Sequence, residues 1–246
     1  MNMRVILLLG GLALASRAGA QETQATASVP GPPADPWSGK AALGYLATSG
    51  NTESSSLNST FAIAYSTGRW THALDLAAIN ATEEEQTTAE AYAAGWKSEF
   101  NMTDKDFLFG RVNWRKDRFS GYDQQLSESI GYGRRLIDTG VHFLDAEIGV
   151  GARQSDLSDG TTEDDFIVRG GLDYRWAFSA TAEFTQVVAT ESGAQNTYLE
   201  SVSAIKASLI GELALVASYT VKNNSEVPVD NEQTDTFTAL SLEYSF

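Results

Sequence analysis

Charged side chains recur at alternate positions of several stretches of this sequence. In the segment Asp165–Trp176, Arg169, Asp173 and Arg175 fall at odd positions, while apolar residues such as Phe166 occupy the even ones. Successive side chains of a β-strand point to opposite faces, so such a stretch has one charged and one apolar face. Charged faces that enclose a narrow passage can bind or conduct small charged solutes.

Ten positions on such faces are the candidate pore-lining residues, and they carry both signs of charge. They are Arg111, Arg115, Arg135, Asp145, Glu147, Arg153, Arg169, Asp173, Arg175 and Glu243. An isolated enclosed charge is costly, so these groups must be paired or hydrated. Two alternatives follow: a narrow water-filled pore for small charged solutes, or a salt-bridged, largely plugged interior that holds the protein together.

Hydrolytic chemistry has little support in the sequence. A serine hydrolase needs a nucleophile, a general base and an orienting acid, and the chain has only two histidines, His72 and His142. Asp75 lies near His72, but no serine is placed by spacing to complete a triad. We predict no enzyme activity and no catalytic residue, and a hydrolase is the least favoured alternative.

Two acidic stretches, 82–86 and 156–165, offer the oxygen ligands that calcium and magnesium prefer. The residues from Asp156 to Gly160 do not follow the EF-hand pattern. We therefore predict acidic, solvated loops without a specific metal site and no cofactor. Binding of divalent cations by these loops stays an alternative.

The N-terminus has the features of a secretory signal peptide: Arg4, an apolar run from Val5 to Ala15, and an Ala-x-Ala site ending at Ala20. We expect residues 1–20 to be cleaved, residues 21–36 to form a proline-rich periplasmic linker, and residues 37–246 to form one domain. The net charge of −15 disfavours nucleic-acid binding. The chain has no cysteine, so no disulfide supports the fold.

From Lys40 onwards the pattern predicts strands and no amphipathic helix. About twelve strands are expected, an even number that suits a bacterial barrel, with alternately short and longer polar connections. The predicted strands are 40–48, 54–66, 70–81, 87–101, 106–119, 124–137, 141–154, 165–176, 181–190, 197–208, 212–222 and 234–246.

The last strand carries the clearest indication of location. Leu240, Leu242, Tyr244 and Phe246 share one face, and Glu243 lies on the other. This ending resembles the C-terminal signal by which bacterial outer-membrane proteins engage the barrel assembly machinery, with Tyr244 and Phe246 as the signal residues. We expect this strand to pair with residues 212–222 on one side and to close against residues 40–48 on the other.

Together these patterns predict an all-β fold: a transmembrane, antiparallel, up-and-down β-barrel of about 12 strands in the bacterial outer membrane. The apolar faces would contact lipid and the charged faces would line the lumen. Expected partners are outer-membrane lipid and lipopolysaccharide, together with the assembly machinery.

The stretch from Trp37 to Glu53, with Leu43-Gly44-Tyr45 followed by Ser49-Gly50-Asn51-Thr52, resembles a family of uncharacterised bacterial proteins described as salt-induced outer membrane proteins. The resemblance covers roughly residues 37–246 and implies the fold and the location, but no reaction. It implies a porin-like envelope protein of Gram-negative bacteria: a narrow passive channel or an envelope protein in salt or osmotic adaptation. The alternative is a closed structural barrel that interacts with lipopolysaccharide.

Overall fold

The computed structural model describes residues 35–48, 54–84, 86–117, 122–227 and 231–246. The predicted signal peptide and most of the predicted linker lie outside these residues. The described chain forms twelve strands: β1 (Trp37–Thr48), β2 (Ser54–Thr67), β3 (Trp70–Glu83), β4 (Gln86–Asn101), β5 (Asp106–Asp117), β6 (Tyr122–Asp138), β7 (His142–Leu157), β8 (Thr162–Ser179), β9 (Ala182–Ser192), β10 (Thr197–Ile210), β11 (Leu213–Asn224) and β12 (Thr234–Ser245). No helix among the described residues is long and apolar enough to cross a membrane.

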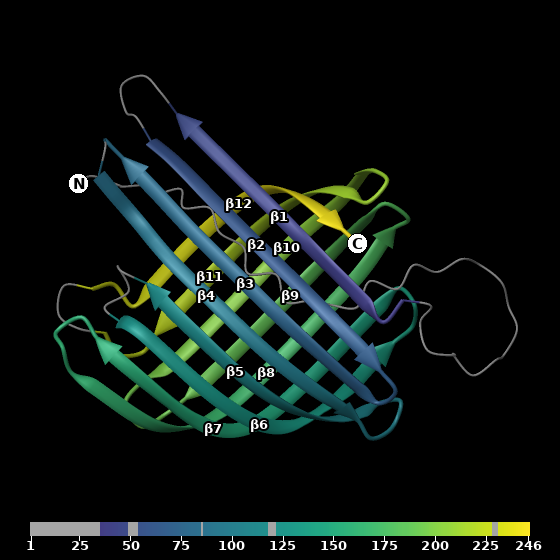
Figure 1. Ribbon diagram of the computed structural model, residues 1–246, viewed down its shortest axis with the longest axis horizontal. Helices are drawn as coiled ribbons and strands as arrows, with labels where there is room; N and C mark the ends of the chain where they lie inside the picture. Colours follow the sequence, from purple (N-terminus) through teal and green to yellow (C-terminus); the bar gives the residue numbers. More distant parts are fainter. Residues whose placement is uncertain (1–34, 49–53, 85, 118–121, 228–230) are drawn as a thin grey trace, which may run out of the picture.

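The strands form one closed barrel (Figure 1). Every strand pairs antiparallel with its neighbours in sequence, and β12 closes the ring by pairing with both β11 and β1. The predicted fold and the predicted partners of the last strand are therefore confirmed. This pairing closes the edges of β1 and β12 against each other between Lys40 and Leu43 of β1.

Several connections are shorter than the sequence indicated. The acidic stretch 82–86 was predicted as a loop, but β3 continues to Glu83 and β4 begins at Gln86. The stretch 156–165 is likewise mostly strand, because β7 ends at Leu157 and β8 begins at Thr162. In both places polar residues continue the ladder, since a strand outside an apolar layer needs no apolar face to remain hydrogen-bonded.

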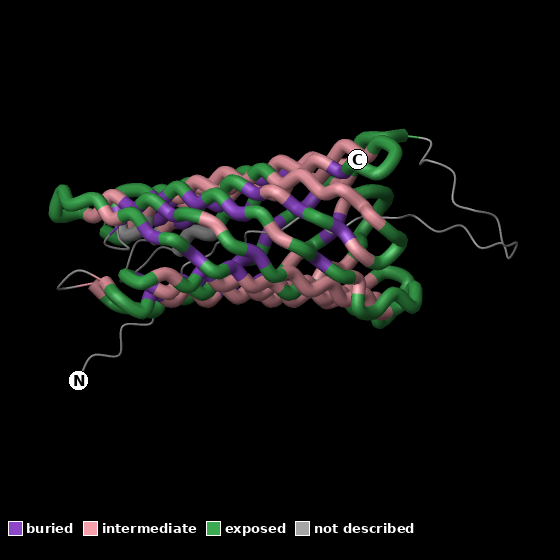
Figure 2. The backbone as a smooth tube through the Cα atoms, turned by 90° about the horizontal axis from the view of Figure 1, so that it is seen from below, coloured by how far each residue is buried: buried purple, intermediate pink, exposed green. Residues whose placement is uncertain are grey.

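Buried and exposed residues alternate along the strands (Figure 2). In β12, Leu240, Leu242 and Tyr244 are about half exposed on the outer surface, whereas Ser241 and Glu243 are buried inside. The outside of the barrel is thus apolar and the inside is polar and charged. This is the reverse of a soluble barrel, and it is the arrangement of a barrel that spans a membrane.

An aromatic girdle surrounds the end of the barrel that carries the short turns. His72 of β3 stacks between the Trp70 and Trp96 rings, with centroid distances of 5.7 and 5.8 Å. His142 of β7 stacks on Trp176 at 5.8 Å. Amphipathic rings of this kind favour the boundary between hydrocarbon and water, so this end of the barrel is fixed at an interface.

The seam between β1 and β12 is paired over a short stretch, from Lys40 opposite Ser245 to Leu43 opposite Leu242. Gly44 follows on β1. A Cβ added there would collide with the side chain of Asn58 and with the backbone of β12. Because Gly44 leaves this space open, Asn58 Nδ2 of β2 reaches across β1 and donates a 3.2 Å hydrogen bond to Ser241 Oγ.

Candidate functional site: the charged lumen

A lumen cavity of about 640 Å³ opens at the short-turn end of the barrel. We call it the vestibule. Seven of the ten candidate pore-lining residues line it: Arg111, Arg135, Asp145, Glu147, Arg169, Asp173 and Arg175. The β6–β7 turn, including Thr139 and Gly140, borders its mouth. The vestibule therefore places charges of both signs in a space that is large enough for a small solute.

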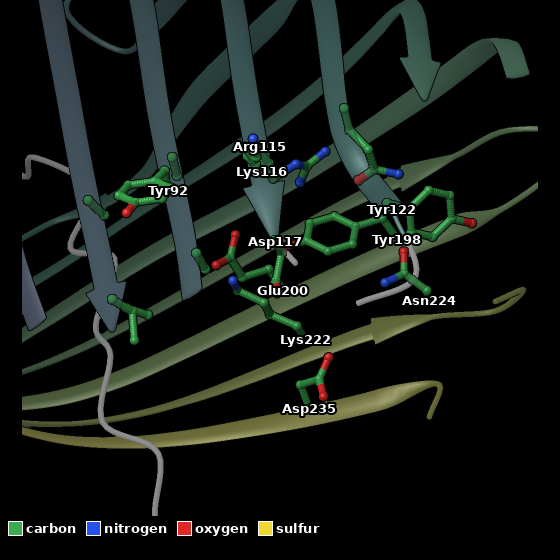
Figure 3. A pocket seen from close by; sticks show the side chains of 15 residues that line it. Tyr92, Arg115, Lys116, Asp117, Tyr122, Tyr198, Glu200, Lys222, Asn224 and Asp235 are labelled. Atoms are coloured by element: carbon green, nitrogen blue, oxygen red, sulfur yellow. The ribbon is translucent and has the colours of Figure 1, made fainter. Parts of the chain in front are cut away.

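Two smaller cavities continue the vestibule towards the opposite end. A middle cavity of about 50 Å³ shares Arg111 and Arg169 with the vestibule. An outer cavity of about 60 Å³ shares Arg115 and Tyr198 with the middle one. The outer cavity lies between strands β4–β6 and strands β10–β12, as its labelled side chains show, with Asp235 among them (Figure 3). The three cavities form a series that is interrupted by charged side chains.

Glu191, near the end of β9, is the central residue of the charged side chains that separate the lumen cavities. Its carboxylate accepts hydrogen bonds from Arg115 Nη2 at 2.7 Å, from Arg169 Nη1 at 3.2 Å and from Ser127 Oγ at 3.1 Å. Glu191 is only 2% exposed. We call these four residues the Glu191 cluster. It joins strands β5, β6, β8 and β9 across the lumen, and its carboxylate is the shared partner of two enclosed arginines.

Arg153 of β7 extends this network towards the β9–β10 connection. Its Nη2 lies 3.0 Å from Asp165 Oδ2 and donates a 2.6 Å hydrogen bond to the carbonyl of Asn196. Its Nη1 donates to the Glu191 carbonyl at 3.4 Å. Asp165 also accepts from the backbone N–H of Gln195. The buried pair of Arg153 and Asp165 therefore holds the connection across the end of the barrel.

A second group of ion pairs lies at the vestibule wall. Lys97 Nζ of β4 is 2.6 Å from Glu99 Oε1 and also contacts Glu147 of β7. The ammonium lies over the rings of Phe107 and Phe109, at 5.3 and 5.6 Å from their centroids. Cation–π contacts add to the ion pairs here, so Lys97 is well satisfied.

Glu243 of β12 pairs with Lys206 of β10 at 2.7 Å and with Lys40 of β1 at 3.9 Å. Both lysines lie on strands near the seam. At the rim of the vestibule, Arg175 stacks on Phe143 at 3.9 Å from the ring centroid. Arg135 donates to Asn101 Oδ1 at 2.8 Å. All ten candidate residues lie inside the barrel, and their role in lining a conducting pore stays a prediction.

Three of the ten make neither a hydrogen bond nor an ion pair within the part of the chain that the structure describes. Arg111 of β5 is 8% exposed and its Nε is enclosed without a partner. Asp145 of β7 and Asp173 of β8 stand directly opposite each other in the ladder and both line the vestibule. Unpaired charges beside a cavity are available to a ligand, whereas those of the Glu191 cluster are already occupied.

The sequence pattern did not reveal Glu191 as the centre of this network. Glu191 was assigned to a loop, because the strand was predicted to end at Thr190, but β9 continues to Ser192. The signal was present: Glu191 lies at an even spacing from Glu183, so both fall on the same face of β9. Lys206 and Asp165 were also missed as lumen residues.

The two histidines belong to the outer surface. His72 Nδ1 is hydrogen-bonded to Ser98 Oγ at 2.9 Å, and His142 Nδ1 to the hydroxyl of Tyr174 at 2.9 Å. In the described ranges no carboxylate is hydrogen-bonded to either ring. Both side chains lie in the aromatic girdle.

The acidic residues of the β7–β8 connection are engaged locally. Asp159 accepts hydrogen bonds from the hydroxyl and the N–H of Thr161, at 2.6 and 2.9 Å, and these bonds lower the pKa of Asp159. Asp156 accepts from Gln124 Nε2 at 2.8 Å. Among the described residues, no group of three or more His, Cys, Asp or Glu side chains is arranged to hold a metal ion.

The fold and the lumen define the class of the protein: a transmembrane β-barrel with a charged interior. The chain belongs to the family described as "Protein of unknown function, DUF481", which matches residues 41–246. It is 35% identical over 243 residues to the uncharacterized protein YdiY of Escherichia coli (strain K12), covering 98% of this chain and 96% of that protein.

Two solved structures with a similar fold have low sequence identity to this chain. The NanC porin is 7% identical, with a TM-score of 0.49 and coverage of 85% of this chain and 97% of that one. The translocator domain of the autotransporter NalP from Neisseria meningitidis is 14% identical, with a TM-score of 0.44 and coverage of 85% and 87%.

Proposed function

We propose that this protein is a narrow passive channel for small charged solutes in the bacterial outer membrane. The observation that carries the proposal is the series of three cavities along the lumen, in which neighbouring cavities share charged side chains such as Arg111, Arg169 and Arg115. A barrel with a purely structural role would gain stability from an apolar filling, because replacing buried ion pairs by apolar residues is often neutral or stabilising.

The outer-membrane location rests on the apolar outer face and the aromatic girdle. In this orientation the short-turn end with the vestibule faces the periplasm, and Phe246 lies beside the girdle at the same end. We propose that β12, with Tyr244 and Phe246, is recognised by the barrel assembly machinery, and that the outer face contacts lipid and lipopolysaccharide. From the resemblance to salt-induced outer membrane proteins, we also propose a role in salt or osmotic adaptation.

A closed structural barrel is the second candidate, and the Glu191 cluster favours it. Arg115 and Arg169 are both tied to one buried carboxylate. In such a barrel the cluster would cross-link the strands permanently, and the vestibule would be a blind pocket.

Conductance of the purified protein in planar lipid bilayers separates the two candidates. The channel predicts discrete current steps, and Arg175→Glu should shift the reversal potential in a salt gradient towards cations, because Arg175 lines the vestibule. Arg134→Glu is the matched control: Arg134 lies one residue from the lumen-facing Arg135, and its side chain is 53% exposed. It should leave the reversal potential unchanged. Absence of steady current would favour the closed barrel.

A further inference from the structure

Arg111 occupies an unusual position in the lumen. It lies on β5 at the junction of the vestibule and the middle cavity, and it lines both. The residue is 8% exposed, and its Nε is enclosed without a hydrogen-bond partner. Within the described residues it forms no ion pair either. An enclosed guanidinium without an anion is unfavourable, because it has lost water and gained no counter-charge.

Three carboxylates of other strands are bound to cations other than Arg111. Lys97 stands directly opposite Arg111 in the ladder, and it already holds Glu147 and Glu99. Glu191 is held by Arg115 and Arg169. Glu99, Glu147 and Glu191 are thus bound to other cations, and within the described residues Arg111 forms no ion pair that would keep it from a group outside the barrel wall.

Arg169 of β8 supplies a second donor at the same junction. It lines the same two cavities as Arg111, and its Nε is also enclosed without a partner, although its Nη1 is bound to Glu191. Asp75 of β3 lines both cavities as well. The junction thus places one carboxylate and two guanidinium groups around a small space, and one of the two guanidinium groups has no ion-pair partner.

We propose that Arg111, assisted by Arg169, binds a small oxoanion that enters through the vestibule: a carboxylate or a phosphate group. The planar guanidinium presents paired N–H donors that match two oxygens of such a group. The vestibule, at about 640 Å³, admits a small solute, and the lumen narrows at the junction to the middle cavity of about 50 Å³, where the solute would meet Arg111. The role of this site in passage rests on the proposed function, but the binding itself does not require conduction.

The test is calorimetric titration of the folded full-length chain in lipid nanodiscs, with inorganic phosphate and with acetate as separate probes. The wild-type protein should bind at least one of them, and the two arms show whether phosphate or carboxylate is preferred. Arg111→Met should weaken that binding about tenfold or more, because charged hydrogen bonds are lost. Arg111→Lys keeps the charge but not the paired donors, so it should bind between wild type and Arg111→Met.

Arg134→Met is the matched control. Arg134 of β6 lines none of the three cavities, and its side chain is 53% exposed and pairs with Asp106. This variant should bind the probe within about twofold of wild type, since an exposed charge outside the lumen is screened by salt. An equal loss in both variants would mean a diffuse positive field and would overturn the site.

The remaining outcomes are also decisive. Wild-type protein that binds neither phosphate nor acetate overturns the site, even when it conducts ions. Should Arg111→Met fail to fold, the comparison of Arg111→Lys with wild type decides: unchanged binding of the preferred probe overturns the proposal. If the protein binds phosphate but carries no current, the anion-binding site is supported and the channel is overturned. The two proposals can therefore fail separately.

Discussion

The lumen has two regions that use arginine differently. In the Glu191 cluster, Arg115 and Arg169 share one carboxylate that is 2% exposed. At the edge of the vestibule, Arg111 has no such partner among the described residues, although it lies four residues before Arg115 on the same face of β5. Both residues are arginines on the lumen face of the same strand. The difference between them therefore comes from the side chains that the other strands place beside each one.

This difference distinguishes charged side chains that hold the strands together from charged side chains that can bind a solute. A paired, buried arginine joins strands, and removing its partner leaves an uncompensated charge. An unpaired arginine beside a cavity contributes little to holding the wall together, and it is available to a solute. The comparison can be tested by measuring what each buried charge contributes to stability.

The largest effect is expected for Glu191→Gln. The amide keeps the shape of the side chain but leaves Arg115 and Arg169 without their counter-charge. The free energy of unfolding should fall by about 3–5 kcal/mol, the usual result of breaking a buried ion pair. Urea titration in lipid vesicles, followed by tryptophan fluorescence, measures it. A loss below about 1 kcal/mol would show that the cluster is well hydrated and does not hold the strands.

A smaller effect is expected for Arg153→Met. The substitution removes the ion pair with Asp165 and the hydrogen bond to the Asn196 carbonyl. Asp165 keeps the backbone N–H of Gln195 as a donor, so it is not left entirely alone. The free energy of unfolding should fall by about 1.5–3 kcal/mol, the range for hydrogen bonds to charged groups. The same urea titration measures it, and a loss as large as that of Glu191→Gln would place the centre of the network at Arg153.

The sequence predicted the wall of the barrel much better than the contacts inside it. Strand positions and lumen faces follow from a period of two residues, which is a local property. That is why residues as far apart as Arg111 and Glu243 were placed on inward faces. The alternation in β12 also indicated which side chains face outwards, and Leu240 and Leu242 are exposed accordingly.

Pairing inside the lumen is not local. Arg115 and Glu191 are 76 residues apart, and they meet because β5 and β9 lie across the lumen from each other. Barrel closure and the register of all intervening strands decide that contact. The strand ends were mispredicted for a related reason: beyond the apolar layer the ladder continues through polar residues, so the hydrophobic pattern that locates a strand disappears before the strand ends. Glu191 lies in such an extension of β9.

The smallest effect is expected for Glu183→Gln, which makes the same chemical change as Glu191→Gln on the same strand. Both residues point into the lumen from β9, but the side chain of Glu183 is 27% exposed and lies 3.9 Å from Arg175. Water and salt screen such a pair, and Arg175 retains the Phe143 ring as a second contact. The free energy of unfolding should fall by at most about 1 kcal/mol. Strand, face and substitution are the same in Glu191→Gln and Glu183→Gln. The ratio of their losses in the free energy of unfolding therefore measures the effect of burial and ion pairing. Equal losses would mean that β9 responds to any change of charge, and the distinction between the Glu191 cluster and the vestibule would no longer hold.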